Sequence, residues 1–221
     1  MRVSLPSGTP AELVQPDPSP GEQPARGLVL LPDIGGLRSL MDHHVRTLSE
    51  ATGWPVCAPE PWPGREDLPI GERLGLVGTL EDAAVLADAA AAADATGAAD
   101  VAVLGFCMGG MYALKASTTG RFTRAVAFYG MIRVPEQWAS PTQAQPLGLM
   151  AAGHCPVLAI IGGDDVWTPA ADVADLEAAG AEVVVYPGAE HGFVHDPERD
   201  AHRPDDAADA WRRVLDFLLA P

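Results

Sequence analysis

Cysteine, basic residues and long hydrophobic runs are all scarce in this sequence of 221 residues. Cys57, Cys107 and Cys155 form an odd, sparse set, which excludes a disulfide framework. No apolar run approaches the ~20 residues that a membrane-spanning helix needs. The first residues also lack the apolar stretch and cleavage site of a signal peptide. We therefore expect a cytoplasmic protein.

The shortage of basic residues leaves a strong negative charge. Fourteen Lys and Arg stand against 30 Asp and Glu, so the formal net charge is -16. A surface this acidic repels nucleic-acid phosphates and anionic membranes, and we expect neither as a partner. An anionic substrate would have to be bound by a few local basic groups.

Apolar residues are plentiful, at 48% of the chain, and suit one compact domain over 1–221. Two short edge strands (2–5 and 11–14) and a loop (15–26) are expected first. Continuous apolar runs then predict strands at 27–31, 54–58, 101–104, 124–129, 157–161 and 182–186. Helical spacing predicts helices at 37–51, 79–96, 108–117, 170–179 and 206–219, the second opened by a capping box from Thr79 to Asp82.

This alternation of strands and helices predicts an α/β fold. Its sheet should be mainly parallel and twisted, with helices on both faces and functional groups at the carboxyl ends of the strands. Two segments interrupt the alternation: a Pro/Trp-rich loop at 59–69 and an irregular stretch from Pro135 to Gly153, which is a candidate cap over the site.

The segment Gly105-Phe-Cys-Met-Gly109 has the strand–turn–helix pattern of a nucleophile elbow, with cysteine in place of the usual serine. The glycines let strand and helix approach closely, and the helix N-terminus favours a thiolate. Cys107 is therefore the candidate nucleophile. Cys57 and Cys155 lack flanking glycines and are interpreted as small buried hydrophobes.

Two later strand ends supply candidate partners for Cys107 in the order expected for this fold: nucleophile, acid, histidine. Asp164 and Asp165 follow the strand at 157–161, and we choose Asp165, with Asp164 as the second possibility. His191 follows the last strand in a glycine-flanked loop and is the candidate base. A metal site at His191, His195, Asp196 and His202 is a minor alternative, because it lacks zinc-site spacing, so we expect no metal and no cofactor.

An oxyanion hole in such a fold uses two backbone N–H groups. One belongs to the residue after the nucleophile, Met108, and the other to a loop after an earlier strand. The segment from Leu31 to Gly36 supplies that loop, with Ile34 as the candidate donor.

With these positions assembled, the chain resembles the dienelactone hydrolase family of α/β-hydrolases over roughly residues 28–218. The resemblance rests on Gly105-Phe-Cys-Met-Gly-Gly110, Gly162-Gly-Asp-Asp165, Glu190-His-Gly-Phe193 and Leu30-Leu-Pro-Asp-Ile-Gly-Gly36. It implies a triad of Cys107, His191 and Asp165 that hydrolyses a small ester or lactone through an acyl-enzyme. The alternative is a non-hydrolytic relative on the same fold that senses redox state or binds a ligand. We expect a monomer or weak homodimer.

Two departures from the family pattern bear on the substrate. The family's turn acid is usually glutamate and contacts the resting cysteine, whereas this chain has Asp33, one methylene shorter. Members specific for dienelactone place an arginine four residues after the histidine, where this chain has His195. Asp33 and His195 are thus candidate substrate-binding or modulating residues. Possible substitute cations are Arg38, Arg73 and Arg203.

Overall fold

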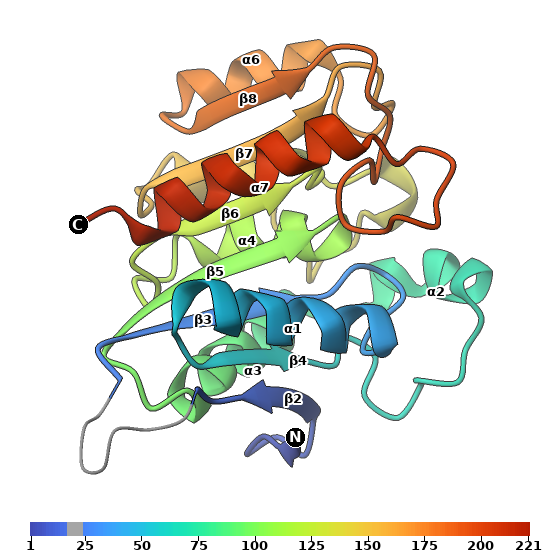
Figure 1. The fold of residues 1–221 in the computed structure, drawn as a ribbon. Helices are drawn as coiled ribbons and strands as arrows, with labels where there is room; N and C mark the ends of the chain where they lie inside the picture. The colour runs from blue at the N-terminus through green and yellow to red at the C-terminus, as the bar shows by residue number, and fades with distance from the viewer. Residues whose placement is uncertain (17–23) are drawn as a thin grey trace.

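The computed structural model describes residues 1–16 and 24–221, which form an eight-stranded sheet (Figure 1). Residues 17–23 of the loop expected at 15–26 lie outside the described part. In chain order the strands are β1 (Arg2–Ser4), β2 (Pro10–Val14), β3 (Arg26–Leu31), β4 (Val56–Pro59), β5 (Asp100–Phe106), β6 (Ala125–Phe128), β7 (Val157–Gly162) and β8 (Glu182–Tyr186).

Across the sheet the strands run β1-β2-β4-β3-β5-β6-β7-β8. The pairs β1–β2 and β2–β4 are antiparallel, and all the pairs from β4 to β8 are parallel. The prediction of a mainly parallel sheet is confirmed. The two antiparallel pairs lie together at one edge of the sheet. Because β3, β5 and β6 are parallel, all three strands end at the same side of the sheet.

Helices cover both faces of this sheet, as expected. They are α1 (Ser39–Thr52), α2 (Ile70–Leu76), α3 (Asp82–Ala95), α4 (Met108–Ala116), α5 (Pro146–Met150), α6 (Ala170–Ala178) and α7 (Pro204–Leu219), with 3-10 turns η1 (Val77–Thr79) and η2 (Glu136–Trp138). In Figure 1, α1 and α7 lie in front of the sheet, while α3 and α4 lie behind it. No helix in the described part is long and apolar enough to cross a membrane.

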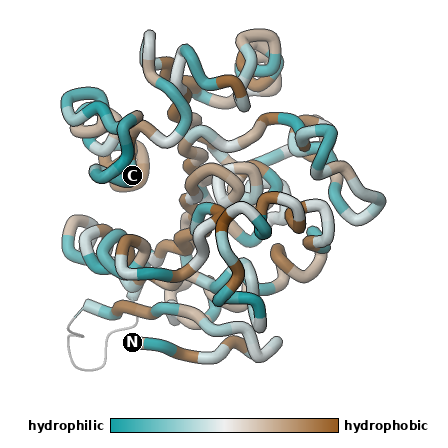
Figure 2. Tube along the Cα trace, turned by 90° about the vertical axis from the view of Figure 1, so that its right-hand side faces the viewer, coloured by the Kyte–Doolittle hydropathy of each residue, from teal (hydrophilic) through white to brown (hydrophobic). Residues whose placement is uncertain are grey.

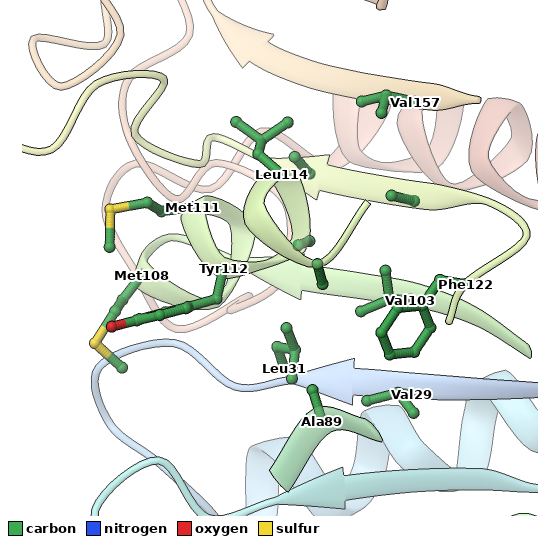
Figure 3. Packing of buried hydrophobic residues seen from close by; sticks show 14 of the residues in the cluster. Val29, Leu31, Ala89, Val103, Met108, Met111, Tyr112, Leu114, Phe122 and Val157 are labelled. Atoms are coloured by element: carbon green, nitrogen blue, oxygen red, sulfur yellow. The ribbon is translucent and has the colours of Figure 1, made fainter. Parts of the chain in front are cut away.

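The central strands are buried on both faces, which explains their unbroken apolar sequences. Along β3, Leu28 and Leu30 pack toward α1 and α7, whereas Val29 and Leu31 pack toward α3 and α4. Figure 3 shows the second of these layers, where Val29 and Leu31 lie beside Ala89 of α3. Hydrophobic stretches accordingly run through the middle of the molecule in Figure 2.

Two short helices, α2 and α5, have no counterpart in the sequence-based expectations. Helix α5 has only five residues and lies in the stretch 135–153 that was expected to be irregular. Helix α2 has seven residues, and Arg73 is its only buried side chain. Gly71 and Gly75 weaken its helix propensity further. A short, exposed, glycine-containing helix carries no apolar periodicity, so the sequence gives no signal for it.

The expected capping box at the start of α3 is wrong. The helix begins at Asp82 after Glu81, and neither Glu81 nor Thr79 caps it with a side chain. The Asp82 carboxylate instead accepts hydrogen bonds from Lys115 Nζ at 2.7 Å and from the amide of Ala144 at 2.8 Å. The Asp82 carboxylate, which the motif predicts as part of the helix cap, therefore pairs with the buried ammonium group of Lys115.

Candidate active site

Cys107 lies at the turn between β5 and α4, with its backbone in the left-handed region at φ 55°. A methyl group on Gly105 would lie 2.0 Å from the carbonyl oxygen of Gly109. One on Gly109 would lie 2.1 Å from the carbonyl oxygen of Leu31. These contacts leave no room for any side chain at the two glycines, and they hold Cys107 in a strained turn at the N-terminus of α4.

His191 and Asp165 meet beside this turn. His191 Nδ1 lies 2.8 Å from Asp165 Oδ2, and the Asp165 side chain is fully buried. The other carboxylate oxygen, Oδ1, accepts a hydrogen bond from the amide of Trp167 at 2.9 Å. The loops carrying the two residues pack closely, because a methyl group on Gly162 would lie 2.4 Å from the carbonyl oxygen of Ala189.

The neighbouring carboxylate has a different environment. Asp164 is exposed, and its amide donates to the carbonyl oxygen of Ala189 at 2.9 Å. Of the two acids left open by the sequence, Asp165 is the one whose side chain contacts His191.

The surroundings of His191 favour its protonated form. Burial lowers the pKa of the imidazole, but the hydrogen bond to Asp165 and the interaction with the Cys107 side chain outweigh it and raise the pKa to about 9. The imidazole thus interacts with the Asp165 carboxylate and with the Cys107 side chain.

Backbone amides of Ile34 and Met108 are the expected oxyanion donors. Within the described residues, neither N–H donates a hydrogen bond to a loop, turn or side-chain acceptor. The carbonyl oxygen of Ile34, which belongs to the following peptide group, accepts from Trp62 Nε1 at 2.9 Å and Arg73 Nη1 at 3.2 Å. The loop that carries Ile34 is therefore fixed while its N–H stays available.

Glu60 and Trp62, which hold this loop, were missed by sequence reasoning. The Glu60 carboxylate accepts from the amide of Leu37 at 2.8 Å and from the amide of Trp62 at 2.9 Å. Both residues lie in the Pro/Trp-rich segment directly after β4. The available signal was a buried strand ending in a charged residue at the carboxyl edge of the sheet.

Asp33 and His195 form a buried pair. His195 Nε2 lies 2.8 Å from Asp33 Oδ2, and the Asp33 carboxylate also accepts two hydrogen bonds from Arg38, at 2.6 and 2.9 Å. Burial raises the pKa of Asp33, but the hydrogen bonds from His195 and Arg38 outweigh it and hold the pKa well below its usual value. With the other ring nitrogen 2.6 Å from the hydroxyl of Tyr129, His195 has no free nitrogen for a substrate.

The other two candidate cations are also engaged. Arg73 is 5% exposed, and its guanidinium donates to the carbonyl oxygens of Ile34, Leu68 and Glu66. Arg203 pairs with Asp206 at 2.7 Å. The minor metal alternative finds no support in geometry, since no cluster of three or more His, Cys, Asp or Glu occurs in the described residues.

The segment 135–153 contributes a wall at the rim. It contains η2 and α5, and Trp138 of η2 stacks on Trp167 with ring centroids 5.4 Å apart. Trp167 lies 6.4 Å from the ring of His191. The stacked pair places aromatic surface beside the candidate base.

A separate cavity of about 260 Å³ lies behind the oxyanion loop, lined among others by Pro32, Trp62, Leu80, Met108 and Gly109. Neither Cys107 nor His191 lines it. Leu31, Pro32 and Gly109, whose backbones pack closely together, all line this cavity.

A mainly parallel sheet covered on both faces, with a cysteine elbow and an Asp–His pair at its carboxyl edge, defines an α/β-hydrolase fold. Residues 11–220 match the model of the dienelactone hydrolase family, and the chain belongs to that family.

Individual relatives support this family assignment. A crystal structure titled "Putative Dienelactone Hydrolase" from Klebsiella pneumoniae superposes with a TM-score of 0.87 at 26% identity, covering 100% of this chain and 98% of that one. The Bradyrhizobium protein named "Probable 2-oxo-3-(5-oxofuran-2-ylidene)propanoate lactonase" is 33% identical over 53% of this chain and 49% of its own length. A Yersinia pestis protein named "Putative carboxymethylenebutenolidase" is 33% identical over 53% and 46%. The aligned part thus spans about half the length of these curated relatives.

Proposed function

We propose that this protein hydrolyses a small ester or lactone, with Cys107 as nucleophile, His191 as base and Asp165 as the acid that orients His191. The observation that carries the proposal is the 2.8 Å contact of His191 Nδ1 with Asp165 Oδ2 beside a cysteine held at φ 55°. A nucleophile, a base and an orienting acid are the minimum set for covalent acyl transfer.

In the first half-reaction the Cys107 thiolate attacks the carbonyl carbon, and the N–H groups of Ile34 and Met108 stabilise the oxyanion. His191 then gives its proton to the leaving alkoxide, which departs as the alcohol. In the second half-reaction His191 takes a proton from water, and the resulting hydroxide attacks the thioester. The tetrahedral intermediate collapses with cleavage of the C–S bond, so the acid is released, Cys107 leaves as the thiolate and His191 keeps the proton taken from water.

The basic residues singled out as substitutes for the family's arginine are all engaged, which favours an uncharged substrate. Arg38 is engaged by Asp33, Arg73 by backbone carbonyl oxygens and Arg203 by Asp206. His195 is buried between Asp33 and Tyr129. The aromatic wall of Trp138 and Trp167 adds apolar surface. We therefore propose neutral, short-chain esters and lactones as the substrate class.

The test is hydrolysis of p-nitrophenyl acetate followed from the first turnover, together with the Cys107→Ala and His191→Ala variants. We expect an initial burst equal to the enzyme concentration, and loss of turnover in both variants. Full activity in either variant would show that the assignment is wrong. A parallel panel of cis-dienelactone, trans-dienelactone and neutral esters tests the substrate class, and preference for the anionic dienelactones would contradict it.

Intact-mass measurement separates this function from that of a thiol sensor. A hydrolase gives an acyl adduct on Cys107 that decays with time after the ester is removed. A redox sensor gives only oxidised or glutathionylated Cys107 and no acyl adduct.

A further inference from the structure

Hydrogen bonds link Arg38, Asp33, His195 and Tyr129 in series, and the Tyr129 ring contacts the ring of His191. Arg38 holds Asp33, the residue before Ile34, and Asp33 Oδ2 lies 2.8 Å from His195 Nε2. His195 Nδ1 lies 2.6 Å from the hydroxyl of Tyr129. The Tyr129 ring in turn lies edge-on to the ring of His191, with centroids 5.2 Å apart.

Asp33 holds the Arg38 guanidinium, so its carboxylate is an acceptor, and His195 Nε2–H must donate to it. In a neutral ring the other nitrogen, Nδ1, is an acceptor, so the Tyr129 hydroxyl donates to it, and the same oxygen accepts the backbone N–H of His195 at 3.3 Å. All these groups are satisfied with one tautomer of His195, which makes the chain directional.

Tyr129 is held in an unfavourable backbone conformation. Its φ is 39°, in the left-handed region that residues with a side chain rarely occupy. The turn is forced by the next residue, because a methyl group on Gly130 would lie 2.3 Å from the carbonyl carbon of Gly110 in α4. Such strain, of about 1–3 kcal/mol, persists only where surrounding contacts hold it. The buried hydroxyl bond to His195 is one of those contacts.

We infer that His195 and Tyr129 are positioning residues, which hold the loop of Ile34 and the base His191 in register through the hydrogen bonds from Asp33 to Tyr129 and the ring contact of Tyr129 with His191. His195 acts on Ile34 through Asp33 and on His191 through Tyr129. Neither side chain touches the substrate, because both are at most 1% exposed. The inference rests on the proposed function for its hydrolysis readout, and on Cys107 chemistry alone for its alkylation readout.

Two substitutions of His195 separate its bond with Asp33 from its bond with Tyr129. In His195→Asn the amide oxygen replaces Nδ1 and keeps the acceptor for Tyr129, but the contact with Asp33 is lost. In His195→Gln the longer amide reaches Asp33, but Tyr129 loses its acceptor. Tyr129→Phe removes the same bond from the other side while keeping the ring. It serves as a second variant should His195→Gln fail to fold.

The first readout is the rate of Cys107 alkylation by iodoacetamide against pH, followed by peptide mass spectrometry, which needs no substrate. We expect His195→Gln and Tyr129→Phe to move the midpoint by about one pH unit upward, because a less constrained His191 supports the thiolate less well. His195→Asn should keep the wild-type profile. The inference is overturned if neither His195→Gln nor Tyr129→Phe moves the midpoint, or if His195→Asn moves it equally.

The second readout is p-nitrophenyl acetate hydrolysis. Each His195 variant should lower kcat by about tenfold with little change in KM, since each loosens one side of the site. The matched control is His154→Gln, whose ring contacts only the carbonyl oxygens of Cys155 and Ala179, and it should match wild type. Absence of wild-type hydrolysis would refute the proposed function alone, because the alkylation profiles still decide the inference.

Discussion

The indole nitrogen of Trp62 donates a hydrogen bond to the carbonyl oxygen of Ile34 at 2.9 Å, from a side chain that is only 1% exposed. Arg73 binds the same oxygen at 3.2 Å. Trp62 in the loop after β4 and Arg73 in α2 thus hold the Ile34–Gly35 peptide group. The adjoining peptide group carries the N–H that we propose for the oxyanion, so these two side chains support that N–H through the neighbouring unit of the loop.

Replacing Trp62 with Phe tests this support. The variant loses one bond to Ile34 and leaves Arg73 as the remaining donor, so kcat should fall by about tenfold while KM changes little. Steady-state kinetics with p-nitrophenyl acetate provide the measurement. Trp54→Phe is the matched control, because Trp54 lies at the amino end of β4 and contacts Arg26. An unchanged kcat in Trp62→Phe would show that Arg73 alone fixes the loop.

Alanine substitution tests the close packing at the elbow. Gly105→Ala or Gly109→Ala would place a methyl group within about 2 Å of backbone oxygen, so each should destabilise the fold by more than about 3 kcal/mol. Gly71 and Gly75 of α2 are the controls, because a methyl group there meets nothing within 4 Å. Alanine at either should raise stability by about 0.5–1 kcal/mol. Urea unfolding measures all four, and near-equal values would contradict the packing argument.

The Asp165–His191 contact predicts a pH dependence of stability. The pKa of His191 is raised from 6.5 to about 9, so the folded state binds this proton more tightly than the unfolded state. The resulting stabilisation is fully present below about pH 6.5 and is lost as the pH rises through about 9. The Tm of wild type should therefore fall between these values relative to that of His191→Gln. Parallel Tm curves for the two proteins would contradict this.

A direct measurement of the same contact uses NMR of the His191 ring. Asp165→Asn removes the hydrogen-bonded carboxylate, so the pKa of His191 should drop below its wild-type value. Asp164→Asn changes the adjacent, exposed acid and should leave the titration where it was. If the two variants gave equal shifts, long-range charge and not the contact would account for the raised pKa.

Lys115 is the only lysine in the sequence, and its side chain is fully buried against Asp82. Lys115→Met leaves the Asp82 carboxylate without its counter-ion and should cost about 3–5 kcal/mol in the free energy of unfolding. The double variant Lys115→Met, Asp82→Asn should be more stable than the single one, because no unpaired charge remains. Urea unfolding of both proteins tests this, and additive losses would argue against coupling.

The sequence predicted the elements with strong local signals. Continuous apolar runs identified β3, β5 and β7, since strands covered on both faces need apolar residues at every position. The glycines at 105 and 109 identified the elbow because their role is steric and local. Chain order and strand ends were enough to bring Asp165 and His191 to one edge of the sheet.

Contacts between distant loops were not predictable in the same way. Asp33 and His195 are separated by 162 positions, and their meeting depends on strand order and on the path of two loops. Nothing in local periodicity encodes that path. Trp62 and Ile34 are 28 positions apart, and their bond likewise follows from β3 and β4 lying side by side. The capping box failed for the same reason, because Lys115 of another helix binds Asp82.

The two N–H groups proposed for the oxyanion belong to the main chain, at Ile34 and Met108, and every amino acid except proline supplies such a group. Ordinary mutagenesis therefore cannot delete them without altering the backbone itself. Their contribution can be isolated by chemical ligation that exchanges one amide for an ester, which replaces the N–H group by an oxygen atom and keeps the side chain. Amino-acid substitutions can therefore change the geometry of the proposed oxyanion hole only through the side chains that hold the loop of Ile34.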